Sequence, residues 1–137
     1  MTEESLKQRL KEFALRIMHL CDHLPNTQAG RIVAGQLIRS STSAGANYRA
    51  ACRGRSPADF VAKLAIAEEE IDESAYWLDL IISRPLFKPV RVRPLYVEAD
   101  ELTRILTASR ITAKRNHQKA PIENRKSKIE NPPGRSP

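Results

Sequence analysis

Residues 36–48 of the chain read Gln36-Leu37-Ile38-Arg39-Ser40-Ser41-Thr42-Ser43-Ala44-Gly45-Ala46-Asn47-Tyr48. Side chains this small, placed within a helical pattern, let two helix backbones approach each other closely. Such a run is typical of a packing seam and not of a reaction centre. The stretch therefore predicts an assembly of helices, and it does not by itself indicate an activity.

Apolar residues recur at helical spacing on both sides of this stretch. We expect four helices, at about Ser5–Leu24, Thr27–Arg53, Ser56–Ser83 and Leu95–Arg115. The predicted inward positions of the second helix are Val33, Leu37, Ser40 or Ser41, Ala44, Tyr48 and Ala51.

Capping and helix-breaking residues between these segments support the same boundaries. Thr27 and Ser56 can cap helix starts, and Pro57 suits a first helical position. Gly54 is expected to take the left-handed conformation that often follows a helix. Three prolines between Arg84 and Pro94 predict an irregular connection there.

The chain length of 137 residues suits one domain with one core. We predict an all-α, antiparallel up-down four-helix bundle over residues 1–115. Residues 116–137 contain four prolines and five basic groups but few apolar side chains, so we expect a disordered basic, Pro-rich tail.

The sequence predicts a soluble, cytoplasmic protein. Its longest uncharged stretches are far shorter than the roughly 18 apolar residues of a membrane span. Charged residues throughout the first twenty positions leave no apolar core for a signal peptide. Cys21 and Cys52 form no C-x-x-C pair and are expected to act as small hydrophobes.

The net charge of +7 is unevenly distributed. The segment from Thr27 to Ser56 holds five arginines and no acid, whereas the predicted third helix holds seven acids and one lysine. These two elements should attract each other, either as antiparallel neighbours within one subunit or between subunits.

A second set of cations has no evident acidic partner in the sequence. Clustered, unpaired Lys and Arg side chains favour phosphate binding, although solvated surface is the plainer interpretation. The candidate nucleic-acid-binding residues are Arg84, Lys88, Arg91, Arg93, Arg110, Lys114 and Arg115.

The predicted second and third helices carry polar and aromatic side chains outside their core stripes. Aromatic residues in such positions are enriched at protein interfaces, so these side chains favour a subunit interface. For Trp77 the alternative is that it flanks the core of its own bundle. The candidate interface residues are Arg39, Ser43, Arg49, Ile66, Glu70, Glu73, Tyr76 and Trp77.

We predict no catalytic site, no metal site and no cofactor. Glu69, Glu70 and Glu73 lack the Glu-x-x-His partners of a di-metal bundle centre. His19 and His23 have the spacing of a two-histidine metal site, but no third ligand is identifiable. The glycines form no phosphate loop, and the serines of the seam have no histidine base.

Two segments also carry a resemblance to a known family. Gln36 to Ala50, together with Asp59–Leu64 and Glu69–Leu80, resembles the bacterial four-helix-bundle proteins first noticed as reading frames in intervening sequences of large-subunit ribosomal RNA genes. The similarity covers about Leu6 to Lys114. It implies a ring, typically a homopentamer, and a distant relationship to basic accessory proteins of retroelements that bind nucleic acid and a reverse transcriptase.

From these observations we expect a non-enzymatic, ring-forming bundle whose basic surface engages RNA or a nucleoprotein partner. The alternative is a protein interaction scaffold without a nucleic-acid role, in which basic groups only satisfy acidic surfaces across subunit joints. Charge reversal at Arg39 or Arg49 should then dissociate the oligomer.

Overall fold

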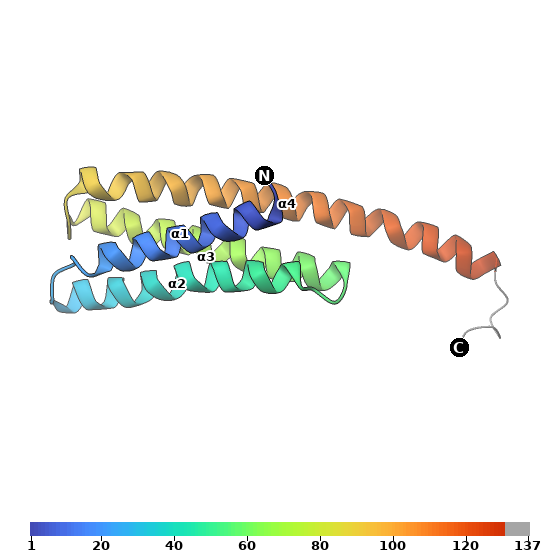
Figure 1. The fold of residues 1–137 in the computed structure, drawn as a ribbon, viewed down its shortest axis with the longest axis horizontal. Coiled ribbons are helices and arrows are strands. Elements are labelled where there is room, and N and C mark those ends of the chain that lie inside the picture. The colour runs from blue at the N-terminus through green and yellow to red at the C-terminus, as the bar shows by residue number, and fades with distance from the viewer. Residues whose placement is uncertain (131–137) are drawn as a thin grey trace.

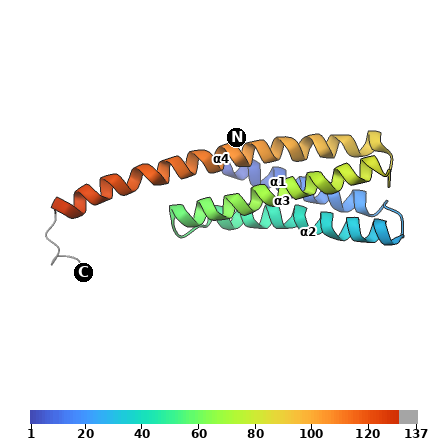
Figure 2. The same cartoon turned by 180° about the vertical axis from the view of Figure 1, so that it is seen from behind.

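The computed structural model describes the fold of residues 1–130 and the side chains of residues 1–119. Its four helices are α1 (Glu3–Cys21), α2 (Gln28–Cys52), α3 (Pro57–Ser83) and α4 (Pro89–Glu130). Consecutive helices run in opposite directions and lie side by side, as Figures 1 and 2 show from opposite sides. The prediction of an all-α chain with four helices is confirmed.

Each helix packs against two neighbours in a closed square. α2 lies between α1 and α3, and α4 closes the square by contacting both α3 and α1. α1 and α3 therefore occupy diagonal positions. The outward sides of these two helices face away from each other.

The inward side of the small-residue stretch is buried, as expected. Ser40, Ser41 and Ala44 each expose 0% of their surface within the chain. The hydroxyl oxygens of Ser40 on α2 and Ser74 on α3 lie 2.7 Å apart. Ser74 also donates to the carbonyl oxygen of Glu70, so the buried hydroxyls are satisfied while the two helices stay close.

The predicted helix starts are confirmed by their capping bonds. Thr27 Oγ1 accepts a hydrogen bond from the Gly30 amide at 3.1 Å, and Ser56 Oγ accepts one from the Asp59 amide at 3.1 Å. Thr2 caps α1 in the same way by accepting from the Ser5 amide, so α1 begins at Glu3, two residues before the predicted start at Ser5.

Two local predictions are wrong. No described residue has a positive φ, so Gly54 does not take the left-handed conformation. Its lack of a side chain is instead used for close approach, because a Cβ there would lie 2.8 Å from the Ala51 carbonyl oxygen. The connection after α3 is also shorter than expected, since α4 begins at Pro89 and not at Leu95.

The early start of α4 has a physical reason. A proline is tolerated in the first turn of a helix, where its missing amide has no intrahelical partner. Val92 is fully buried and Leu95 is 5% exposed, so the first turns of α4 contribute to the core. Pro94 lies on the exposed side of the helix.

The end of α4 also differs from the expectation. The helix continues past Arg115 to Glu130, and Figures 1 and 2 show it projecting beyond the ends of the other helices. The expected irregular tail thus does not begin at Asn116. Residues 131–137 of that predicted segment lie outside the described residues.

The turn between α1 and α2 depends on a glycine that the sequence analysis did not single out. A Cβ on Gly30 would lie 2.0 Å from the carbonyl oxygen of Pro25. That oxygen belongs to the backbone and cannot rotate away. Gly30 therefore sets how closely the chain folds back at the start of α2.

We predict that Gly30→Ala lowers the free energy of unfolding by about 1–3 kcal/mol, because the backbone of the turn must shift. Gly35→Ala is the control, since a Cβ there meets no atom within 4 Å. This exposed mid-helix change should stabilise the protein by about 0.5–1 kcal/mol. Urea unfolding measures both; equal shifts in the two variants would contradict the role of the Pro25 contact.

Candidate nucleic-acid interface

The seven predicted nucleic-acid-binding cations do not form one patch. Arg84, Lys88, Arg91 and Arg93 lie at the end of the bundle where α3 joins α4. Lys114 and Arg115 lie much further along α4. At 1.5 Å per residue, Arg91 and Arg115 are about 35 Å apart along the helix axis.

Arg110 is matched by an acid on the neighbouring helix, contrary to the expectation from the sequence. Its Nε donates to Glu68 Oε2 at 2.5 Å, and Thr107 Oγ1 donates to Glu68 Oε1 at 2.7 Å. Glu68 is half-buried between α3 and α4. Arg110 thus joins two helices of one chain and is a poor candidate for binding phosphate.

The cations at the bundle end border a groove between α1 and α4. Its volume is about 620 Å³. Lys88 and Arg91 come from the predicted set, whereas Arg16, His19, His23 and Phe87 were not predicted to bind. No acid is among the lining residues, which are Leu15, Arg16, His19, Leu20, His23, Phe87, Lys88, Arg91 and Leu95. We call this set the end groove.

Three rings follow one another along one side of the end groove. The rings of His19 and His23 have their centroids 5.0 Å apart, and those of His23 and Phe87 are 5.7 Å apart. His23 Nδ1 lies 2.9 Å from the carbonyl oxygen of His19, which fixes the orientation of its imidazole. The end groove therefore combines cations with flat rings.

These additional residues could not be linked from the sequence alone. His19 lies on α1 and His23 in the turn that follows it, while Phe87 belongs to the turn before α4. Only the closing of the bundle brings these segments together. Arg84 and Arg93 are exposed at the same end but do not line the groove. Arg93 follows Arg91 by two positions, so it points to another side of α4.

Half of the eight predicted interface residues lie together on α2 and α3. Arg39 forms ion pairs with Glu70 at 3.0 Å and with Glu73, both in the same chain. Trp77 Nε1 donates to Glu73 Oε2 at 3.0 Å, and Trp77 also packs against the core. The charges of α2 and α3 thus pair within one chain, and Trp77 flanks the core of its own bundle.

The other four interface candidates lie on α2 and α3. Ser43 accepts a hydrogen bond from Asn47 Nδ2 at 3.1 Å within α2. Arg49 lines a groove beside α1 and also one that includes Lys63 of α3. Tyr76 is 57% exposed and Ile66 is 41% exposed. Whether any of these residues meets a second subunit stays a prediction.

Three properties of the described residues concern metal binding, thiol reactivity and membrane insertion. Within residues 1–119, no cluster of three His, Cys, Asp or Glu side chains is arranged to hold a metal ion. Burial raises the pKa of the Cys21 thiol to about 11, so the reactive thiolate is scarce at neutral pH. Among the described helices, none is long and apolar enough to cross a membrane.

Comparison with known proteins places the chain. Residues 3–108 match the model of the 23S rRNA-intervening sequence protein family. The chain belongs to this family. A solved structure from Bacteroides thetaiotaomicron VPI-5482, described as a protein of unknown function from the S23 ribosomal protein family, is 34% identical with a TM-score of 0.74. The match covers 80% of this chain and 98% of that one, and a search of curated proteins found no match.

The Glu68 and Arg110 pair gives a testable pH dependence. The hydrogen bond from Arg110, assisted by Thr107, lowers the pKa of Glu68 below its ordinary value of 4.5 despite partial burial. A carboxylate with a lowered folded-state pKa stabilises the protein above the ordinary value, and this contribution is lost as pH falls through the lowered one.

We therefore expect Glu68→Gln to reduce the free energy of unfolding by about 1 kcal/mol at pH 7. The difference from the unmodified protein should shrink between pH 6 and pH 3, measured by urea unfolding. Glu69→Gln, at an exposed position without an ion pair among the described side chains, should stay within about 0.5 kcal/mol throughout. A Glu68→Gln deficit that is constant with pH would argue against the pair.

Proposed function

We propose that this chain is a non-enzymatic helical bundle that binds RNA through the end groove. The observation that supports this most directly is the joining of Arg16, Lys88 and Arg91 around one groove without an acid in its lining. None of these three cations forms an ion pair with a described side chain. Their charge is therefore available to a phosphate backbone.

The rings of the end groove favour nucleic acid over a simple anion. Aromatic side chains stack with bases irrespective of sequence, and neighbouring cations follow the backbone. His23 and Phe87 supply the flat surfaces, and Arg16, Lys88 and Arg91 supply the charge. The groove volume lies in the range of roughly 300–1,000 Å³ that is usual for ligand sites.

RNA is the first nucleic acid to use as a probe, because the description of the family refers to 23S rRNA. Binding that depends on cations releases counterions from the phosphate backbone and weakens steeply with salt. Of the seven residues predicted to bind nucleic acid, only Lys88 and Arg91 line the end groove, and we propose these two as direct contacts. Arg84 and Arg93 are placed to extend the surface, and Lys114 and Arg115 lie too far away to share one short strand.

We expect Lys88→Glu with Arg91→Glu to weaken the binding of a single-stranded RNA oligonucleotide about tenfold or more, measured by fluorescence anisotropy. The slope of log affinity against log salt should fall by about one for each lost phosphate contact. Both positions are exposed, so the fold should persist.

A charge-matched control separates this contact from general repulsion of RNA. Arg31→Glu with Arg104→Glu changes the net charge equally, and neither residue lines the end groove. Its effect should be several-fold smaller. Equal losses in the two variants, or no salt-sensitive binding by the unmodified protein, would refute the proposal.

A second candidate function, self-assembly as a scaffold, is favoured by a different observation. Tyr76 is largely exposed on the outward side of α3, and its ring lies against Trp77 with centroids 5.2 Å apart. Exposed aromatic side chains of this kind are enriched at protein interfaces. We propose that the chain forms the homo-oligomer, with five subunits favoured, that its family resemblance implies; light scattering of the purified protein tests this directly.

A further inference from the structure

The seam between α1 and α2 differs from the other three helix seams. Arg9 pairs with Glu98 across α1 and α4, Arg39 with Glu70 across α2 and α3, and Arg110 with Glu68 across α3 and α4. Among the described side chains, no ion pair joins α1 to α2. This seam instead carries cations on both of its sides.

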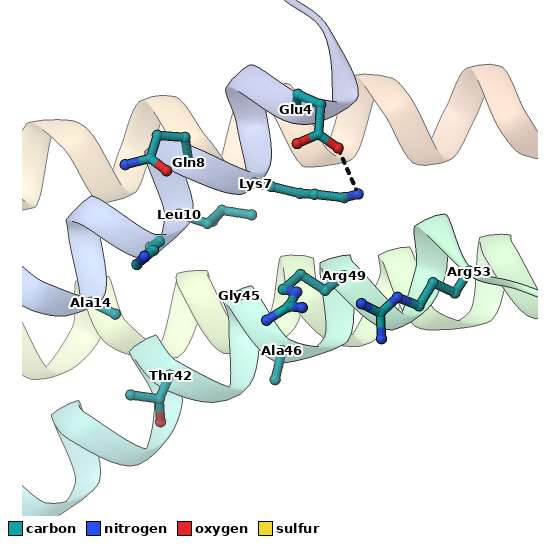
Figure 3. Close-up of a pocket in the computed structure, with 11 residues that line it drawn as sticks. Glu4, Lys7, Gln8, Leu10, Ala14, Thr42, Gly45, Ala46, Arg49 and Arg53 are labelled. Carbon is teal, nitrogen blue, oxygen red and sulfur yellow. Dashed lines mark hydrogen bonds and ion pairs between the residues drawn. The ribbon is translucent and has the colours of Figure 1, made fainter.

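These cations border a groove that is separate from the end groove. Lys7 and Lys11 come from α1, Arg49 comes from α2, and Arg53 caps the end of α2. Figure 3 shows Lys7, Arg49 and Arg53 beside the groove. The lining contains one carboxylate, Glu4, which is held by Lys7 at 3.0 Å. We call this site the basic groove. Like charges that face each other across a seam repel, so the groove favours an acidic occupant.

The lining of the basic groove includes small residues from both helices. Ala14 comes from α1, and Gly45 and Ala46 come from α2 (Figure 3). A Cβ on Gly45 would be 3.9 Å from the nearest atom, on Leu10. The packing within one chain would therefore accept an alanine at this position and does not require a glycine. Small residues on an outward surface let a further helix approach closely.

The chain itself carries a helix face of the matching charge. Glu69, Asp72 and Asp79 are exposed on the outward side of α3 and form no ion pair among the described side chains. Tyr76 lies among them at helical spacing. This acidic face of α3 thus presents three free carboxylates around one projecting aromatic ring.

We propose that the basic groove of one copy receives the acidic face of α3 from a second copy. The proposal rests on the self-assembly described above as a second candidate function and names its contact. Because α1 and α3 are diagonal in the bundle, the two surfaces lie on different sides of a chain. Each copy can therefore give one surface and accept the other, which is the head-to-tail pairing that closes into rings.

Charge exchange tests this contact. Lys11→Glu with Arg49→Glu should lower the mass measured by light scattering toward the 15.4 kDa of a single chain. Glu69→Lys with Asp72→Lys should do the same. Combining all four changes in one chain should restore the larger mass because the signs match again.

Two further variants separate docking from net charge. Lys88→Glu with Arg91→Glu changes the charge as much as the groove variant but leaves the basic groove intact, so its mass should not change. Ala46→Trp places a large ring at the border of the groove, at an exposed position, without any change of charge. It should lower the mass as well.

The outcomes distinguish this contact from assembly in general. A monomeric unmodified protein would overturn both the contact and the self-assembly. An oligomer that survives all the groove and α3 variants would overturn the contact alone. If the groove variant kept its mass and lost RNA binding, the groove would belong to nucleic acid, and the proposed contact would be wrong.

Discussion

The close approach of α2 to α3 is the constraint on which the other features depend. Ser40 and Ser74 meet at 2.7 Å between hydroxyl oxygens, with Ala44 buried beside them. A larger side chain at either serine would separate the helices, because a packed interior has no space to absorb it. With the two backbones held this close, Arg39 on α2 reaches both Glu70 and Glu73 on α3.

The charges divide into a structural set and a free set. Arginines that face a neighbouring helix are paired with glutamates at three seams, and this pairing uses much of the acidity of α3. Of the other cations, Arg16, Lys88 and Arg91 line the end groove, and Lys11, Arg49 and Arg53 line the basic groove. The two grooves lie on the two flanks of α1. The net charge of the chain thus says less about binding than the location of its unpaired groups.

Much of the fold follows from the sequence, because local signals and global packing agree. The caps at Thr27 and Ser56 and the thin inward face of α2 were all predictable from short stretches. The start of α4 was not, since the prolines near it suggested a loop, while burial of Val92 favours a helix. The end groove was only half predictable, because His23 and Phe87 meet through the closing of the bundle. The pairing of Arg110 with Glu68 was missed for the same reason, as these residues are 42 positions apart.

The identity of the cation at the three paired seams has its own consequence. In each case it is an arginine, whose guanidinium keeps its charge far into the alkaline range, whereas a lysine would begin to lose its proton near pH 10. Alkaline solution thus leaves these cross-links intact. Acid solution weakens them instead, because it protonates the glutamate partners.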